Sequence, residues 1–313
     1  MEAAIPPQQT AAATVAQHPM LSRVSAYVAL TKPRIIELLL VTTVPAMFLA
    51  AHGWPDWRLI VVTLVGGTLA AGSANVFNCV LDADIDAEMH RTRTRPMARH
   101  EVAKVPAYIY GSVLAIVSAL VLGFGANWQS AALALVANLY YVFVYTLGLK
   151  RRTSQNIVWG GIAGCFPPLI GWVAVTGSVA WPPLVLFAIV FFWTPPHTWA
   201  LAFRYREDYA KAHVPMLPVV KPAPQVALQI LVYTVVTVLV SLLLWPVAHT
   251  GWLYPLLAGL AGAWLTVEAV ALLLRARAGL TDAALKPMRL FHLSNSYLTL
   301  VFVAAALDPL IFG

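Results

Sequence analysis

The sequence predicts an all-α, polytopic membrane helical bundle with about nine transmembrane helices. Hydrophobic residues make up 60% of the 313 positions and charged residues only 11%, whereas a soluble domain carries about 25% charged residues. Long apolar runs tile most of the chain, and a membrane-spanning helix needs about 20 predominantly apolar residues. None of these runs alternates with a period of two, which speaks against a transmembrane β-barrel.

Nine stretches are long and apolar enough to be spans. They cover residues 35–52, 59–81, 105–123, 129–147, 157–176, 182–200, 226–247, 253–274 and 288–307. Their connections are short, so we expect one compact helical domain over residues 26–313. Residues 1–25 have no basic segment followed by an apolar one, so we interpret them as a mobile cytoplasmic tail and not as a signal peptide.

Basic residues mark one face of the predicted membrane domain. Of the 20 Lys and Arg side chains, 19 fall on the same side of the nine spans, and only Arg58 falls on the other. Because Lys and Arg accumulate in cytoplasmic loops, we expect a multi-pass protein of the inner (cytoplasmic) membrane with its N-terminus inside and its C-terminus outside. This topology and anionic lipid account for the net charge of +7, which requires no nucleic-acid partner.

The first chemically informative motif ends the second span. Asn78, Asp82 and Asp86 follow one another at intervals of four residues, so they share one face of a helix, whereas Asp84 points away. Carboxylate and amide oxygens suit Mg²⁺, which shares its coordination with substrate phosphates. The alternative is a helix end that polar residues merely cap where it meets water. Three oxygen donors in phase favour the metal site.

Arginines follow this motif directly. Arg91, Arg93 and Arg95 bring guanidinium groups, which bind phosphate oxygens, next to the carboxylates. The positive-inside rule alone would also produce a loop rich in Lys and Arg. The loop therefore supports a diphosphate site only in combination with its acidic neighbour.

A second polar segment leaves the sixth span on the same side. It contains the pair Pro195-Pro196, then His197, and later the acids Glu207 and Asp208. A lone membrane histidine is often only a hydrogen-bonded structural residue, yet an ionisable group at membrane depth is a functional candidate by default. Two acidic helix ends on one face would form a clamp for one diphosphate between metal ions.

These motifs resemble those of the UbiA-like intramembrane prenyltransferases. The aspartate-rich segment matches the superfamily signature, and further blocks are similar to its heme-directed, farnesyl-transferring branch. The blocks cover residues 30–34, 78–86, 89–96, 150–153, 160–164, 167–172, 195–197, 208–209 and 215–218. Two positions depart from the pattern. Arg204 stands where many superfamily members, though not the heme-directed branch, carry the first acid of a second aspartate motif, and His213 stands where we expect glycine.

The resemblance implies nine spans and the transfer of a farnesyl group from farnesyl diphosphate to a vinyl group of heme B, with addition of water. It implies Mg²⁺, or Mn²⁺ in its place, held by Asn78, Asp82, Asp86 and Asp208. The cations expected to assist at the diphosphate are Lys32, Arg34, Arg91, Arg95, Lys150 and Arg151. A downstream heme-modifying oxidase is a further expected partner.

His197 is the candidate for binding heme. Neutral imidazole is a good iron ligand, and His197 lies about 10 Å deeper along the helix than Arg204. The alternative is a structural hydrogen bond that ties the Pro195-Pro196 segment to a neighbouring helix. His292 is a weaker candidate for the same role.

Other membrane residues have less specific signals. Glu37 and Glu268 lie inside spans, where an acid pairs with a polar neighbour or extends to the interface. A dry pocket with aromatic faces would stabilise an allylic cation. Candidates for its lining, each of which could equally pack or face lipid, are Tyr140, Tyr141, Tyr145, Phe192 and Trp193.

Two other functions stay open at this point. A UbiA-like prenyltransferase for an aromatic or quinone precursor would keep the first motif but carry a richer second aspartate motif. A secondary transporter would place polar residues and broken helices near the midplane of the membrane. Here the acids cluster at the cytoplasmic rim, which argues against transport.

Overall fold

The structure is a computed structural model that describes residues 19–312, without the side chains of residues 19–22, 34–40 and 282. Every regular element in this part of the chain is a helix. The long helical segments are α2 (Pro33–Ala51), α3 (Trp57–Leu81), α5 (Lys104–Gly125), α6 (Trp128–Leu139) with η1 (Tyr140–Leu149), α7 (Asn156–Gly160) with η2 (Gly161–Cys165) and α8 (Phe166–Thr176), α9 (Trp181–Arg204), α12 (Ala223–Ala248), α13 (Leu253–Arg277) and α15 (Pro287–Phe312). Short helices join them, namely α1 (Pro19–Leu30), α4 (Ala83–Glu88), α10 (Arg206–Lys211), α11 (Leu217–Val220) and α14 (Asp282–Leu285).

These segments confirm the predicted all-α membrane bundle. Eight of them are long and apolar enough to cross a membrane, and α2 contributes the shorter apolar stretch Val41–Ala51. Each predicted span coincides with one long segment to within a few residues. Most of the predicted tail, residues 1–18, lies outside the described residues, and residues 19–25 begin α1. The division into a tail and a membrane domain stays a prediction.

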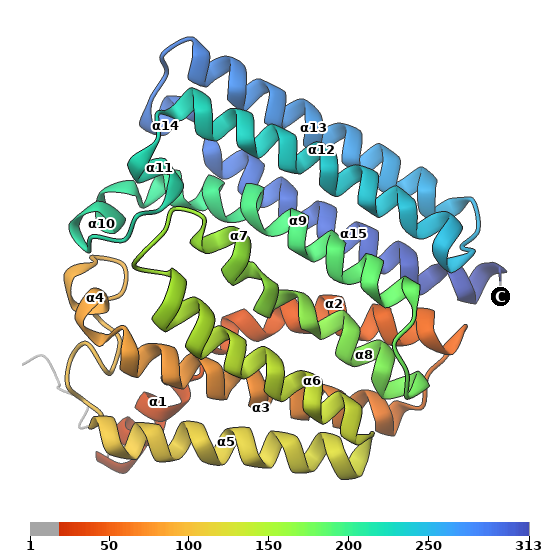
Figure 1. The fold of residues 1–313 in the computed structure, drawn as a ribbon, viewed down its shortest axis with the longest axis horizontal. Coiled ribbons are helices and arrows are strands. Elements are labelled where there is room, and N and C mark those ends of the chain that lie inside the picture. The colour runs from red at the N-terminus through yellow and green to blue at the C-terminus, as the bar shows by residue number, and fades with distance from the viewer. Residues whose placement is uncertain (1–18, 313) are drawn as a thin grey trace, which may run out of the picture.

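The long helices lie side by side and run between two ends of the molecule (Figure 1). One end carries α4, α10, α11 and α14, and we call it the polar end; the C-terminus lies at the other end. One group of helices contains α2, α3, α5, α6 and α8, and a second group contains α9, α12, α13 and α15. The contacts of α15 with α2 and of α7 and η2 with α9 join the two groups.

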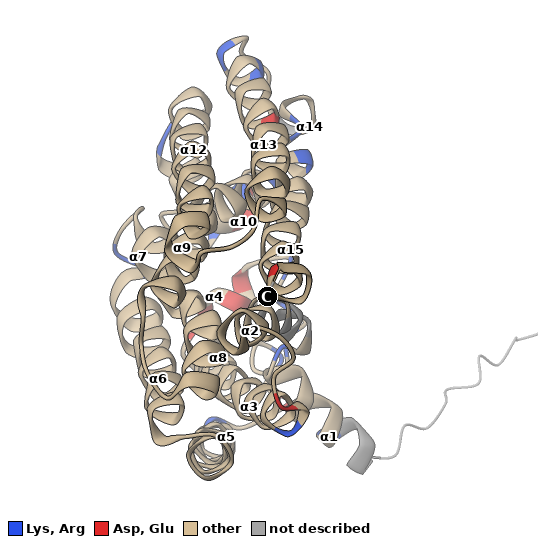
Figure 2. Ribbon diagram, turned by 90° about the vertical axis from the view of Figure 1, so that its right-hand side faces the viewer, with Lys and Arg blue, Asp and Glu red and all other residues tan. Residues whose placement is uncertain are grey.

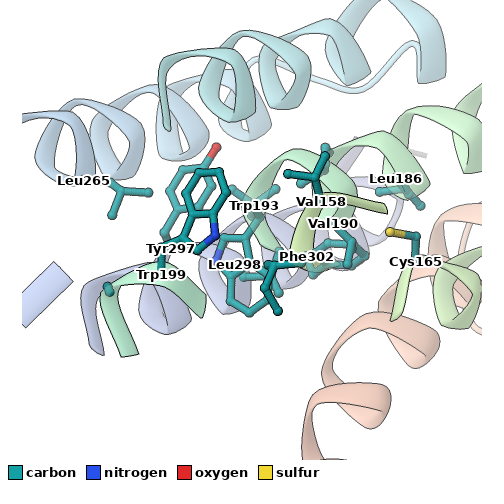
Figure 3. Packing of buried hydrophobic residues seen from close by; sticks show 14 of the residues in the cluster. Val158, Cys165, Leu186, Val190, Trp193, Trp199, Leu265, Tyr297, Leu298 and Phe302 are labelled. Atoms are coloured by element: carbon teal, nitrogen blue, oxygen red, sulfur yellow. The ribbon is translucent and has the colours of Figure 1, made fainter. Parts of the chain in front are cut away.

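The second group packs around large buried side chains (Figure 3). Trp199, Tyr297 and Phe302 are each fully buried there. The Tyr297 hydroxyl donates to Ser241 Oγ over 2.7 Å, and the Tyr254 hydroxyl donates to the Ser241 carbonyl over 2.8 Å. Aromatic bodies fill the interior while their polar atoms find partners on neighbouring helices, as buried tyrosines require.

Charged residues gather at the ends of the helices (Figure 2). The described Lys and Arg residues, Arg58 excepted, lie in the segments of the polar end, whereas Arg58 follows Asp56, the N-cap of α3, at the opposite end. Glu268 lies within α13 and away from its ends. Its side chain is buried and forms ion pairs with Arg275 and Arg289. The expected pairing of Glu268 is thus confirmed, and the side chain of Glu37 lies outside the described residues.

Candidate active site

The first aspartate motif lies where α3 ends and α4 begins. Asp82 occupies the break, with φ −101° and ψ 12°, and its carbonyl accepts from the Asp86 N–H over 2.8 Å. The Asp82 and Asp86 side chains are 1% and 2% exposed, whereas Asp84 is 64% exposed. The sequence spacing therefore predicted correctly which carboxylates share a face, although a turn and not a continuous helix carries them.

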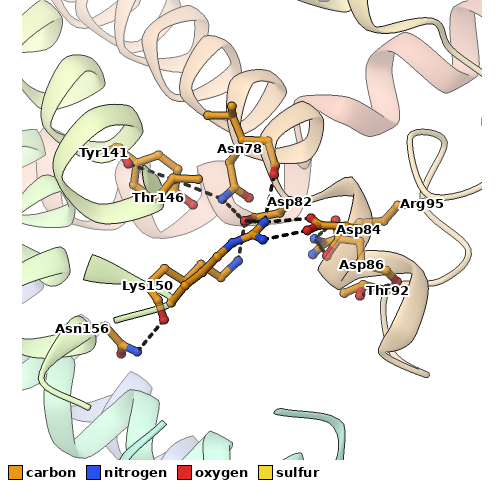
Figure 4. A network of polar contacts seen from close by, with 12 residues as sticks. Asn78, Asp82, Asp84, Asp86, Thr92, Arg95, Tyr141, Thr146, Lys150 and Asn156 are labelled. Carbon is orange, nitrogen blue, oxygen red and sulfur yellow. Dashed lines mark hydrogen bonds and ion pairs between the residues drawn. The ribbon is translucent and has the colours of Figure 1, made fainter. Parts of the chain in front are cut away.

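Asp82 is the centre of a polar network (Figure 4). Its Oδ2 accepts from Asn78 Nδ2 over 2.6 Å and from Lys150 Nζ. Arg151 approaches Oδ1 to 3.6 Å, but its two terminal nitrogens bond to Asp84, each over 2.7 Å. The Arg151 hydrogen bond lowers the pKa of Asp84 to about 2. Lys150, which directly follows η1, is thus the cation nearest to the buried carboxylate.

Asp86 has a cation of its own. Arg95 Nη1 lies 2.8 Å from both Asp86 oxygens, and Thr92 Oγ1 donates to the Asp86 carbonyl over 3.1 Å. The arginine-rich loop therefore folds back over the motif that precedes it. This is the arrangement of acids beside guanidiniums that the sequence order of the two segments predicts.

Lys32 enters the site from the turn between α1 and α2. Its backbone is left-handed, with φ 52°, which is uncommon for a residue other than glycine. This turn lets Nζ donate to Asn78 Oδ1 over 2.7 Å. Burial lowers the pKa of Lys32 to about 8. Strained backbone often accompanies function, and here it directs a desolvated ammonium group at Asn78 of the aspartate-rich motif.

A π-helix sets the opposite wall. The segment η1 has the wide hydrogen-bonding pattern in which Lys150 N–H donates to the Tyr145 carbonyl over 2.9 Å, and π-helical turns are frequent at functional sites. As a result, Tyr141, Tyr145 and Lys150 line one cavity. Gly160 makes room for this wall, because a Cβ there would lie 2.1 Å from Tyr145 Cδ2.

The second motif contacts the first through its loop. Asp208 Oδ2 accepts from the Arg91 backbone N–H over 3.1 Å, and the Arg91 guanidinium lies 5.1 Å from the centre of the Tyr205 ring. Asp208 therefore lies beside the loop that follows the first motif, and the clamp for a diphosphate stays a prediction. His213 adopts φ 51° in the turn after α10, which explains why glycine is expected at this position.

These groups enclose a cavity of about 150 Å³ at the polar end. Among the predicted site residues, it is lined by Lys32, Asn78, Asp86, Arg91, Arg95 and Lys150. Asp82 lies behind Asn78 and Lys150, Asp208 bonds to the loop, and Arg151 turns outward to Asp84. The side chain of Arg34 lies outside the described residues. We call this cavity the donor cavity, because the family resemblance implies that the diphosphate of the prenyl donor binds at these residues.

Sequence reasoning missed two polar residues in the described lining of the donor cavity. Thr198 of α9 and Tyr209 of α10 both line it, and Tyr209 accepts from the Arg91 guanidinium over 3.5 Å. In the sequence, Thr198 directly follows His197 and Tyr209 directly follows Asp208. This adjacency to candidate residues was the only signal that could have indicated them. Neither residue type is specific enough to single out without the fold.

The acidic groups are compatible with a bound divalent cation. The described residues contain no group of three His, Cys, Asp or Glu side chains placed to bind one metal ion. In the first motif, Asp82 is paired with Lys150 and Asp86 with Arg95. Asp82 Oδ1, however, is buried and accepts no hydrogen bond from a described group, and Arg151 comes no nearer to it than 3.6 Å. An unsatisfied buried carboxylate oxygen beside the Asn78 amide is a fitting donor for Mg²⁺. The Asp82–Lys150 and Asp86–Arg95 pairs would have to loosen to admit it.

His197 lies outside the donor cavity, between α9 and α15. Its ring stacks on Trp193 and Phe291, with centroids 4.2 and 4.4 Å away, and its Nδ1 lies 2.9 Å from Ser294 Oγ. This is the contact between helices that the structural alternative predicts. A heme role for His197 stays a prediction, as does that of His292.

An apolar cavity of about 160 Å³ adjoins the donor cavity. Tyr141 lines both. Most of its other lining residues are small or apolar, namely Gly67, Ala70, Ala71, Ala74, Ala134, Ala137, Ala163, Gly164, Phe166 and Ile170. Among the other aromatic candidates, Tyr145 lines the donor cavity and Trp193 packs against His197. A polar chamber thus opens beside an apolar one, which suits a ligand with an anionic head and a hydrocarbon tail.

A polytopic helical bundle with this acid-and-base site defines a class of intramembrane enzyme. The model of the UbiA prenyltransferase family matches residues 39–295. The chain therefore belongs to the UbiA prenyltransferase family and is an integral multi-pass membrane protein.

Within the family, relatives named protoheme IX farnesyltransferase match nearly the whole chain. The protein of Cutibacterium acnes is 69% identical over 92% of this chain and 86% of its own length. That of Nocardioides sp. is 58% identical over 96% of this chain and 98% of its own. The protein of Streptomyces coelicolor is 56% identical over 93% of this chain and 92% of its own length. The resemblance to the heme-directed branch is confirmed.

Solved structures show the same fold at low identity. A digeranylgeranylglyceryl phosphate synthase superposes with a TM-score of 0.76 at 16% identity, covering 93% of this chain and all of its own. A UbiA homologue from Archaeoglobus fulgidus bound to DMAPP and Mg²⁺ superposes with a TM-score of 0.63 at 14% identity, covering 89% and 98%.

Proposed function

We propose that this prenyltransferase transfers the farnesyl group of farnesyl diphosphate to a vinyl group of heme B and releases diphosphate. The observation that carries the proposal is identity of 54–69% over nearly the whole chain to relatives named protoheme IX farnesyltransferase. The bond between farnesyl C1 and the diphosphate oxygen breaks, and C1 bonds to the vinyl group. Water adds its hydroxyl group to the resulting cation and gives up a proton, so the product is heme O.

The donor cavity is the proposed diphosphate site. Lys32, Arg91 and Arg95 line it together with Lys150, and cations fixed before the reaction stabilise the negative charge that builds on a leaving oxygen. Asn78, Asp82, Asp86 and Asp208 are the proposed holders of Mg²⁺ or Mn²⁺. The metal would neutralise the diphosphate when bound, and a family member from Archaeoglobus fulgidus has been solved with Mg²⁺ and DMAPP.

The apolar cavity is the proposed place of the farnesyl tail. It begins at Tyr141, which also lines the donor cavity, so a diphosphate head and an apolar tail would lie on either side of this ring. Aromatic faces there also suit a developing allylic cation. An apolar chamber also excludes water. The allylic cation would then react with the vinyl group before water could capture it.

One experiment tests the reaction directly. Purified protein is incubated with farnesyl diphosphate, heme B and Mg²⁺, and the products are analysed by mass spectrometry. We expect a heme enlarged by one farnesyl group and one water. A prenylated aromatic or quinone acceptor in place of heme O would instead support the other branch of the family. A heme-modifying oxidase that consumes heme O is the proposed partner.

The proposed location is the inner (cytoplasmic) membrane, with the polar end and the donor cavity in the cytoplasm. The support is that 19 of the 20 Lys and Arg residues fall on one side of the predicted spans, because Lys and Arg favour cytoplasmic loops. Single cysteines placed near Arg95 and near Lys211 should react with an impermeant thiol reagent only from the cytoplasmic side. Labelling of either cysteine in intact cells from the outside would contradict this orientation.

His197 is the proposed heme contact, and its substitution separates the two interpretations. If His197 binds heme, H197A should weaken heme binding and leave farnesyl diphosphate affinity nearly unchanged. If its ring only ties α9 to α15 through Ser294, heme and donor affinities should fall together with the thermal midpoint. Heme titration, donor titration and thermal unfolding of the same preparation distinguish these results. Unchanged heme affinity in a stable H197A protein would remove the residue from the site.

A further inference from the structure

A second hollow opens at the polar end of the other helix group. This groove has a volume of about 620 Å³ and lies between the end of α9, the start of α12, α14 and the start of α15. Its lining includes Phe203, Arg204, Arg206, Lys286, Met288 and Arg289. We call it the basic groove. Among the described residues, none lines both the basic groove and the donor cavity, so a ligand in the groove would be distinct from the bound donor.

The groove is strongly positive. Its four cations are exposed, and of these only Arg289 has an acidic partner among the described side chains, Glu268 at 3.4 Å. Arg204, Arg206 and Lys286 form no ion pair with a described acid. Several cations of like charge around one hollow repel one another, and an anion between them relieves this repulsion.

Buried contacts hold one wall of the groove in place. Glu268 pairs with Arg275 as well as Arg289, and Arg275 Nε donates to the Leu285 carbonyl over 3.0 Å. Leu285 itself lines the groove. Glu268 and Arg275 therefore act as positioning residues that fix α14 and the Arg289 guanidinium relative to α13.

The position of the groove indicates the kind of anion. It lies at the ends of membrane-spanning helices, at the level where lipid headgroups meet water. Leu280 directly precedes the groove residue Thr281 and is 40% exposed, and Leu274 is 60% exposed on the last turns of α13. Basic pockets between helices at this level bind acidic lipid headgroups, and guanidinium groups bind phosphate with two donors. We propose that the basic groove binds the phosphate headgroup of an anionic phospholipid.

The test compares two variants of equal charge. R204Q/K286Q removes two groove cations that pair with no acid among the described side chains, and R23Q/K104Q removes two exposed cations outside the groove. Native mass spectrometry of each detergent-purified protein, titrated with phosphatidylglycerol or phosphatidylcholine, measures lipid binding. Each groove cation should contribute about fivefold in affinity. We expect R204Q/K286Q to bind phosphatidylglycerol about 30-fold more weakly, with R23Q/K104Q close to wild type. Thermal midpoints in neutral detergent verify that both variants are folded.

Three results would overturn the proposal. The first is equal affinity of the wild type for the two lipids, and the second is an equal loss in both variants. The third is displacement of phosphatidylglycerol by heme B but not by its propionate diester, which would make the groove a carboxylate site for the acceptor. Because these measurements do not involve turnover, they stand apart from the farnesyl transfer proposed above.

Discussion

Replacing Asp82 with alanine is expected to lower kcat/KM for the farnesyl donor by about 100-fold or more, the loss typical when preorganised charge is removed from an active site. The carboxylate is 1% exposed and accepts from Asn78 and Lys150, and its other oxygen is buried without a hydrogen bond from any described residue. Without it, the proposed metal site loses its central donor and Lys150 loses its counter-charge. Steady-state kinetics over a range of Mg²⁺ concentrations, with donor and heme, measure the effect.

Asp84 supplies the matched control. It lies two residues away and is 64% exposed, paired with Arg151. Because exposed pairs contribute at most about 1 kcal/mol, D84A should change kcat/KM by less than about fivefold. Since D82A leaves the partly buried Lys150 without its carboxylate, which is destabilising, the nearly isosteric D82N is measured beside it. A folded D82N protein that turns over at the wild-type rate without Mg²⁺ would disprove the metal role of Asp82.

Filling the apolar cavity at Gly164 is expected to raise KM for farnesyl diphosphate by about tenfold or more. A Cβ at Gly164 would meet no atom of the described residues within 4 Å, so the backbone tolerates a side chain there. Gly164 also lines the cavity proposed for the farnesyl tail. In G164L the leucine would occupy volume that the tail needs, and overpacking of an apolar site costs about 1–3 kcal/mol. Donor kinetics and inhibition by inorganic diphosphate are measured on the same protein.

The diphosphate measurement separates tail from head. Inhibition by inorganic diphosphate should be unchanged in G164L, because the cations of the donor cavity are untouched. G259L is the matched control, since Gly259 of α13 is equally open and lines neither cavity. If G164L keeps the wild-type KM for the donor, the tail lies elsewhere. If G259L raises KM as much, the effect is one of folding and not of the cavity.

The sequence alone determined the fold class and the faces of the first motif. Spans are visible because lipid requires long apolar helices with internally bonded backbones, and each predicted stretch coincides with a helical segment. The spacing of Asn78, Asp82 and Asp86 correctly separated the two buried carboxylates from the exposed Asp84, because helical periodicity is a local property. The identity of the family was likewise carried by short contiguous blocks.

Only the tertiary structure decided which distant groups meet. Lys150 reaches Asp82 from 68 residues away and Arg91 reaches Asp208 from 117 residues away, and no local pattern predicts such contacts. The π-helix that directs Tyr141, Tyr145 and Lys150 into one cavity arises in a run whose letters look like any apolar span. The basic groove likewise brings Arg204 and Lys286, which are far apart in the sequence, into one lining. Periodicity determines which side of a helix is polar, whereas packing between helices determines what that side faces.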